Sequence, residues 1–207
     1  MLASMMIYVA SRLRGVTIET VILLGIALVF SFNALLALLQ YIATEQALQE
    51  VVFWTLGSLT KASWNKVGIA FATIAVVTPF LIRSAWALTA LRLGDEKARS
   101  LGINVRSLRL RVLVLVSLLA SVAVAFVGTI GFVGLVGPHV ARMIVGEDQR
   151  FFLPVSALAG AVMMSVTSIV SKEIIPGVIF PIGIITALVG VPFFLGLVFA
   201  RRRDSWN

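Results

Sequence analysis

The sequence contains no cysteine, which excludes a disulfide framework and a thiolate metal site. It also carries little charge: 13% of its 207 residues are charged, whereas soluble domains have about 25%. With 60% hydrophobic residues and a mean hydropathy of +1.07, the chain has too few polar side chains to cover a water-facing surface. The composition therefore predicts a protein embedded in a membrane.

The apolar residues lie in continuous runs that approach the roughly 20 residues a membrane-spanning helix needs. The run at 112–145 is too long for one helix, and basic residues flank both of its ends. We therefore expect it to cross twice, as two short helices with a reversal near Gly128. The sequence predicts an all-α polytopic membrane protein, a single transmembrane domain over 1–207 with six spans at 21–43, 67–90, 112–145 (two crossings), 151–171 and 182–200.

Two shorter segments complete this prediction. Residues 1–15 have only about ten apolar positions before Arg12 and Arg14, so they form an N-terminal stub that is too short to span. Residues 44–66 mix acidic, aromatic and basic side chains, including Trp54 and Trp64. That mixture is typical of a short helix at the membrane interface.

The basic residues divide unequally between the two predicted sides of the membrane. Only Lys61, Lys66 and Lys172 fall on one side, and the other 14 of the 17 basic residues fall on the other. The positive-inside rule makes the second side cytoplasmic. The same rule accounts for the net charge of +8, so we expect no nucleic-acid partner.

A polar stretch, LGDEKARSLGIN at 93–104, interrupts the apolar runs. We expect a helix of about two turns there, with Asp95 as N-cap, Glu96 in its first turn and Gly102 as its stop. It lies in a predicted cytoplasmic loop, 92–111, where a second short helix could begin near Val105. Two readings stay open: a solvated loop with arginines reaching to the interface, or a docking knob with Ala98 and Leu101 on one face.

Three motifs carry a resemblance to a known family: ALRLGDEKARSLGINV, GTIGFVGLVGPHVARMIVGEDQR and FPIGIITALVGVPFFLGLVF. In order and spacing the chain resembles the FecCD family of ABC transporter permeases, which import iron–siderophores, haem or cobalamin across the inner membrane of bacteria or archaea. The resemblance implies alternating access without catalytic residues or a cofactor. The implied partners are cytoplasmic ATPase subunits, an extracytoplasmic substrate-binding protein, a second permease copy and the lipid bilayer.

In the family, the loop with this motif forms two short coupling helices that insert into a groove of the ATPase subunit. On this chain the implied contact residues are Gly94, Asp95, Glu96, Lys97, Ala98, Arg99, Leu101 and Gly102. The resemblance covers the family's fifth to tenth spans, so we expect a C-terminal portion. Three alternatives stay open: half of a split permease, an inactive membrane fragment, or an ion-gradient-driven transporter. The last should carry charge in mid-span, where only Arg83 comes near.

Five polar residues, two in the first span and three on one side of the membrane, are further candidates for functional residues. Asn33 and Gln40 lie seven residues apart in the first span and therefore on one helix face. They either form interhelical hydrogen bonds or line a path, and the resemblance favours lining. It also implies that Lys172 meets the binding protein, with Lys61 and Lys66 on the same side. Alternatively, Lys172 pairs with its neighbour Glu173 or with lipid headgroups.

Two further features have structural explanations. Glycines recur every three residues at Gly128, Gly131, Gly134 and Gly137, but no Lys-Ser/Thr follows, so we expect close packing rather than a phosphate loop. The lone His139 has no cysteine or carboxylate cluster beside it and is a poor metal ligand. We expect it to cap a helix or to lie at a helix interface.

Overall fold

The computed structural model describes residues 2–10, 18–175 and 179–204, and all of its regular structure there is helical. The helices are α1 (Leu2–Ala10), α2 (Ile18–Ile42), α3 (Glu45–Thr55), α4 (Trp64–Leu91), α5 (Asp95–Ser100), α6 (Val105–Val127), α7 (Val133–Val145), α8 (Gln149–Glu173) and α9 (Ile182–Asp204). The all-α prediction is confirmed. The predicted basic turn at Arg12 and Arg14, and Pro176 in the turn before α9, lie outside the described residues.

Spanning length is reached by some of these helices and not by others. Within the described residues, four helices are long and apolar enough to cross a membrane: 22–42 of α2, and α4, α6 and α8. Two apolar helices are shorter than a full span: α7, and residues 182–196 of α9. With 13 residues, α7 is only about 20 Å long, less than the hydrocarbon core of about 30 Å. The described residues thus contain four helices of full spanning length and two shorter apolar helices, rather than six full spans.

The reversal predicted near Gly128 is present, because Gly128 ends α6 with a φ of 74°. The helices on either side of it are unequal, however. The prediction of two short helices at 112–145 is wrong for the first of them. Helix α6 begins inside the predicted cytoplasmic loop, at Val105, and runs for 23 residues. The sequence predicts a loop with a second short helix near Val105, but the arginines at 106, 109 and 111 are good helix formers and continue the helix into the apolar run.

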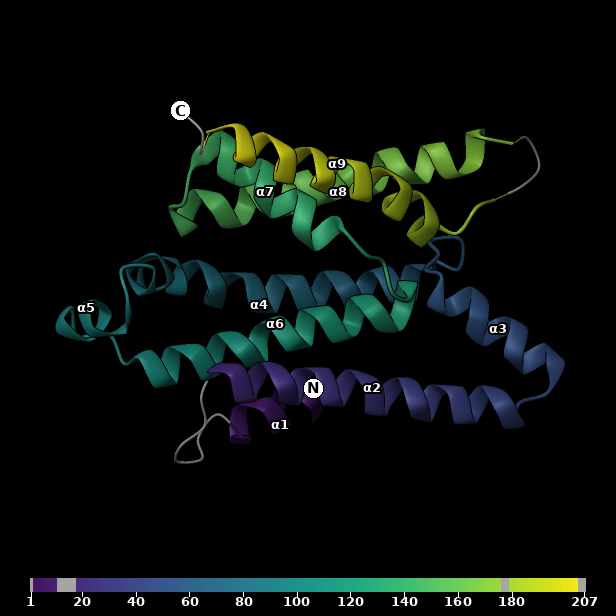
Figure 1. Cartoon of the computed structure of the whole chain (residues 1–207), viewed down its shortest axis with the longest axis horizontal. Helices are drawn as coiled ribbons and strands as arrows, with labels where there is room; N and C mark the ends of the chain where they lie inside the picture. Colours follow the sequence, from purple (N-terminus) through teal and green to yellow (C-terminus); the bar gives the residue numbers. More distant parts are fainter. Residues whose placement is uncertain (1, 11–17, 176–178, 205–207) are drawn as a thin grey trace.

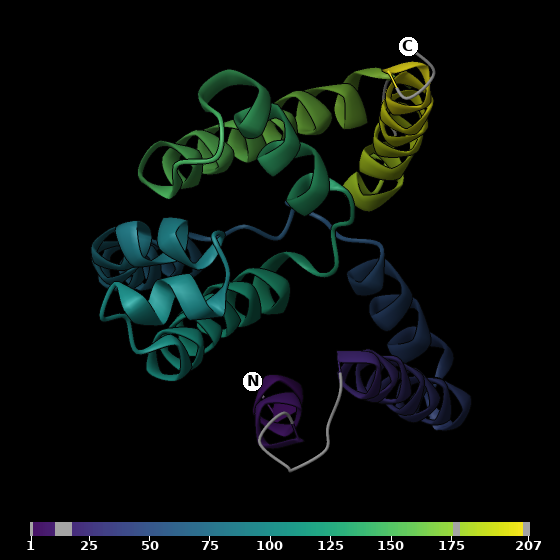
Figure 2. The ribbon, with the colours of Figure 1, turned by 60° about the vertical axis from the view of Figure 1, so that its left-hand side comes forward.

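The helices form three groups (Figure 1). Helices α7, α8 and α9 pack on one another, α4 pairs with α6, and α1 packs against α2. Contacts between α4 and α8 join the first two groups, and contacts between α1 and α6 join the third. Seen from a second direction, α2 lies apart from the α4–α6 pair, with α3 leading from one to the other (Figure 2).

The two ends of the molecule differ in their charged segments. Helix α5, the turn between α7 and α8, and the end of α9 lie at the same end (Figure 1). The start of α4 and the end of α8, which carry Lys66 and Lys172, lie at the opposite end. The arrangement agrees with the predicted division of basic residues, because it separates the segments rich in arginine from those with the three lysines.

Glycines bring backbones together at two of the four positions predicted to do so. A Cβ atom on Gly128 would overlap the carbonyl oxygen of Trp54, and one on Gly137 would crowd the backbone of α8. At Gly131 and Gly134 no atom lies within 4 Å of a built Cβ. The packing prediction is therefore confirmed for Gly128 and Gly137 and is wrong, within this chain, for Gly131 and Gly134.

Candidate functional site

The candidate site is α5 with the helix ends around it. Helix α5 starts after Gly94, whose φ of 102° and ψ of 158° fall in a region that essentially only glycine adopts. Gly94 is the N-cap and makes no side-chain capping bond. The predicted N-cap at Asp95 is therefore wrong: Asp95 is the first helical residue, because the glycine sets the entry angle of the chain.

Helix α5 ends at the predicted place. Gly102 has a φ of 79°, and its N–H donates to the carbonyl oxygen of Arg99 at 2.9 Å. The N–H of Ile103 donates to the carbonyl oxygen of Ala98 at 3.1 Å. This pair of bonds is the Schellman motif, in which a left-handed glycine satisfies the last carbonyls of a helix. The predicted stop at Gly102 is confirmed.

One side of α5 is buried and the other faces outward. Ala98 is fully buried, with 0% of its surface exposed, and α5 contacts both α4 and α6. Leu101 is 51% exposed, so the predicted face shared by Ala98 and Leu101 is wrong: Ala98 anchors the helix and Leu101 points outward. Glu96, Lys97 and Arg99 are also exposed. Helix α5 is thus a small anchored knob with a charged outer surface.

An ion pair ties α5 to the next helix. The Nη2 atom of Arg109 on α6 lies 2.8 Å from Oδ1 of Asp95. Helix α6 starts after Asn104, whose Oδ1 accepts the N–H of Ser107 at 3.0 Å as an N-cap. The predicted second short helix near Val105 is wrong as a separate element, because this capped start continues as α6.

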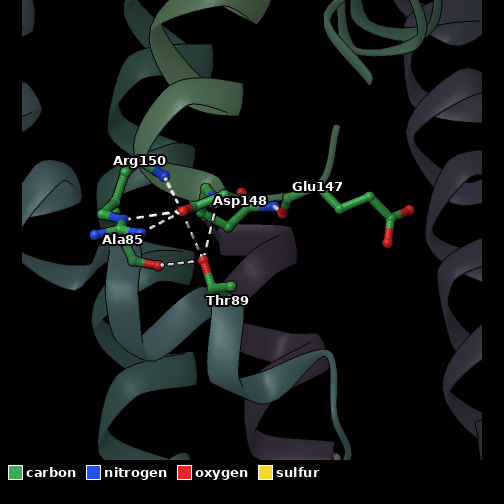
Figure 3. A network of polar contacts seen from close by, with 6 residues as sticks. Ala85, Thr89, Glu147, Asp148 and Arg150 are labelled. Atoms are coloured by element: carbon green, nitrogen blue, oxygen red, sulfur yellow. Dashed lines mark hydrogen bonds and ion pairs between the residues drawn. The ribbon is translucent and has the colours of Figure 1, made fainter. Parts of the chain in front are cut away.

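The turn between α7 and α8 binds the end of α4 through Thr89 (Figure 3). The hydroxyl of Thr89 accepts the N–H of Gln149 at 3.0 Å and lies 3.1 Å from the carbonyl oxygen of Ala85 and 3.5 Å from Oδ1 of Asp148. Asp148 caps α8 by accepting the N–H of Arg150 at 3.0 Å, and its Oδ2 is 2.6 Å from Nη2 of Arg150. One threonine therefore joins two helices beside α5.

The acidic residues of this turn form ion pairs with arginines. Hydrogen bonds from the Arg150 side chain, more than any other cause, lower the pKa of Asp148 from 3.8 to about 2. Glu147 accepts from Arg92 at 2.5 Å and from Arg142 at 3.5 Å. Arg92 is the C-cap of α4, so this ion pair lies three residues before α5 along the chain.

The sequence reading missed this second cluster, although a signal was present. The segment GEDQR at 146–150 places a glycine after one helix and an aspartate before the next, which is the usual stop and start pattern. Gly146 does end α7, and Asp148 does cap α8. The basic flank and the family motif predicted from this segment give no role to Glu147 or Asp148.

The remaining candidate residues lie away from α5. Asn33 is exposed and Gln40 partly exposed on α2, a helix with no buried residue in its apolar window. At the other end, the Nζ atom of Lys66 donates to the carbonyl oxygen of Lys61 at 2.8 Å, and Lys172 is exposed on α8. The pathway and docking roles of these five residues stay predictions.

The opposite end also holds an open cavity of about 490 Å³. Polar side chains of α3 line one wall, among them Gln46, Gln49 and Glu50, and Lys61 lies at the same cavity. The cavity places one of the three lysines next to exposed acidic and amide groups.

His139 lies at a helix interface, which is one of the two roles expected for it. Its ring packs edge-on against Phe193 of α9, with centroids 6.1 Å apart. In the described part of the chain, no group of three or more histidine, cysteine, aspartate or glutamate side chains is placed to hold a metal ion.

The sequence of this chain is similar to those of known transport proteins. The FecCD transport family model matches residues 1–200. The hemin transport system permease protein HmuU of Yersinia pestis is 37% identical over 201 residues, which cover 97% of this chain and 60% of that protein. The molybdate import system permease protein MolB of Haemophilus influenzae is 38% identical over 187 residues, which cover 90% of this chain and 55% of that protein.

A solved structure extends the likeness to three dimensions. It is an inward-facing conformation of a metal-chelate type ABC transporter, with a TM-score of 0.87 and 35% identity over 95% of this chain and 63% of that one. The chain therefore spans about 55–60% of the length of the two curated relatives described above. Because the family model matches nearly the whole chain, this protein belongs to the FecCD transport family.

Proposed function

We propose that this chain forms part of the permease of an ATP-driven importer. Its cargo would be an iron chelate, haem, cobalamin or a similar metal-containing compound, and its mechanism alternating access. Membership of the FecCD transport family supports the proposal, as does the likeness to a metal-chelate transporter. In the assembled importer, the apolar segments that contain α7 and α9 complete six crossings of the inner membrane, and a separate subunit hydrolyses ATP.

The observation that carries this proposal is the anchored knob formed by α5. Ala98 is fully buried, whereas Glu96, Lys97 and Arg99 face outward. The helix connects α4 and α6, each long enough to span. A push on a rigid, anchored helix moves the two helices that hold it, so α5 has the properties needed to pass an ATPase movement to the membrane.

The second cluster supports the same role for this end of the molecule. Glu147 pairs with Arg92 at the last turn of α4, and Thr89 accepts the first backbone N–H of α8. These contacts join α8 to α4 directly before α5. A displacement of α5 is therefore passed to α8 as well as to α4 and α6.

We assign the opposite end to the substrate-binding protein and the middle to the pathway. Lys61 and Lys172 are exposed there and would meet acidic groups of the binding protein. Asn33 and Gln40 lie on one face of α2, which is bare within this chain. We place that face toward the pathway formed with a second permease copy.

Transport assays test the proposal against its alternatives. The permease that contains this chain is reconstituted in proteoliposomes with its ATPase and binding protein, and uptake of haem or a ferric chelate is followed. We expect uptake that requires ATP and survives ionophores. Uptake abolished by ionophores and independent of ATP would instead indicate an ion-gradient-driven transporter. Absence of uptake by a complex that assembles and hydrolyses ATP would indicate an inactive fragment.

A further inference from the structure

A groove of about 740 Å³ opens at the α5 end of the molecule, between α1, α4 and α6. Its size falls in the range of small-molecule sites, about 300–1,000 Å³. Of the residues assigned to ATPase coupling, only Arg99 lines this groove. Its chemistry is divided, with charged residues along the rim and apolar residues along the wall.

The rim carries three arginines: Arg99 at the end of α5, and Arg106 and Arg109 on the first turns of α6. All three side chains are exposed. Arg109 pairs with Asp95. Among the described residues, neither Arg99 nor Arg106 has an ion pair with a carboxylate. The groove is therefore lined by two arginines without a carboxylate partner, and guanidinium binds phosphate oxygens in a bidentate fashion.

The wall below the rim is apolar and runs into the membrane region. It is formed by Leu88 and Leu91 of α4 and by Leu113 and Val116 of α6. Ten residues separate Arg106 from Val116, which is about 15 Å along a helix. The hydrocarbon core is about 30 Å thick, so the wall reaches about as deep as one leaflet.

We propose that this groove binds one anionic phospholipid from the leaflet on the α5 side. The headgroup phosphate lies on Arg99 and Arg106, and an acyl chain lies along the wall toward Val116. Charge complementarity selects this occupant, because basic pockets between membrane helices attract anionic headgroups. The bound headgroup bridges α5 and α6 beside the Asp95–Arg109 ion pair, so it steadies the knob that we assign to the ATPase.

Native mass spectrometry tests the proposal on the intact transporter complex. The complex is extracted from nanodiscs containing equal amounts of phosphatidylglycerol and phosphatidylcholine, and the retained lipid is counted. We expect phosphatidylglycerol to be retained in preference. Arg106→Gln should lower its retention about five-fold, the effect of one basic residue near a membrane surface. Arg111→Gln removes an exposed arginine of α6 outside the groove and should leave retention unchanged.

A second pair of variants tests the wall independently of charge. Val116 and Val114 are 48% and 45% exposed on α6, and only Val116 lines the groove. Val116→Trp should fill the groove and lower lipid retention, whereas Val114→Trp should not. Both positions are half-exposed, so both variants are expected to fold.

Three results would overturn the proposal. Equal retention of the two lipids would leave only an apolar contact surface. Equal losses in Arg106→Gln and Arg111→Gln would indicate general surface charge. Cross-linking of a photoreactive residue at Val116 to a polypeptide, rather than to lipid, would show that another protein segment fills the groove.

Discussion

Asp95 at the start of α5 and Arg109 on α6 form an ion pair, with Oδ1 and Nη2 2.8 Å apart. The two residues are fourteen positions apart in sequence, and the pair closes the connection between α4 and α6 into a braced loop. Both side chains remain partly exposed, at 38% and 62%. The pair therefore fixes the orientation of the knob more than it stabilises the fold.

Exchanging the charges of this pair tests whether it orients α5 or stabilises the fold. An exposed ion pair contributes about 0–1 kcal/mol, so Asp95→Arg should change the unfolding midpoint little. It places two cations together, however, and should lower ATP-driven uptake several-fold. The double variant Asp95→Arg/Arg109→Asp should recover uptake. Loss of uptake that the double exchange leaves unrepaired would show that the pair has no such role.

Bulky residues at both ends of α5 should uncouple ATP hydrolysis from transport. Gly94 and Gly102 have positive φ and open space around a built Cβ, so Trp at either site distorts the backbone without a clash, at about 1–3 kcal/mol each. We expect the Gly94→Trp/Gly102→Trp variant to hydrolyse ATP with little uptake. Gly68→Trp is the control for added bulk, since Gly68 has equally open space and lies near the start of α4, at the end of the molecule opposite α5. Normal uptake by the double variant would contradict the coupling role of α5.

Two glycines of the central motif should respond to alanine in opposite directions. At Gly128 a Cβ would overlap the Trp54 carbonyl oxygen, and φ is 74°. Overpacking of about 1–3 kcal/mol adds to a left-handed strain of about 1–2 kcal/mol, so Gly128→Ala should lower the unfolding midpoint clearly. Gly134 is helical with nothing nearby, so Gly134→Ala should stabilise by up to about 1 kcal/mol. Thermal unfolding in detergent measures both, and equal shifts would refute the packing at Gly128.

Reversing the charge of Lys172 should slow docking of the binding protein. Lys172 is exposed, and within the described residues no ion pair joins it to Glu173. Exposed ion pairs act mainly on the rate at which two proteins encounter each other. Lys172→Glu should therefore reduce the association rate several-fold at low salt, and the difference should shrink as salt rises. Surface plasmon resonance on the reconstituted complex gives the rates. An unchanged rate at low ionic strength would mean that Lys172 lies outside the docking surface.

Features set by local backbone chemistry could be predicted from the sequence. Gly102 stops α5 because glycine adopts a left-handed conformation without strain, and Gly128 reverses the chain for the same reason. The apolar runs located the spanning helices because membrane helices need continuous apolar surface. These signals depend on residues close together in sequence.

Features set by tertiary contact could not be predicted in the same way. The inward direction of Ala98 depends on where α4 and α6 lie, which two residues at helical spacing do not reveal. The same holds for Thr89, which binds residues 59 and 60 positions away. The continuity of α6 was missed for another reason. A helix beginning near Val105 is predicted, but only as a short element in a loop rich in arginine, whereas these arginines lie on the first turns of a continuous helix.

Site-specific photo-cross-linking at α5 tests the central claim most directly. A photoreactive amino acid replaces Lys97 on the outer face of α5 or, as the control, Lys61 at the opposite end, both of which are exposed. In the assembled transporter, we expect position 97 to cross-link to the ATPase subunit and not to the binding protein, and position 61 to show the reverse. Cross-links to the ATPase from position 61, with none from position 97 in an intact complex, would contradict the account.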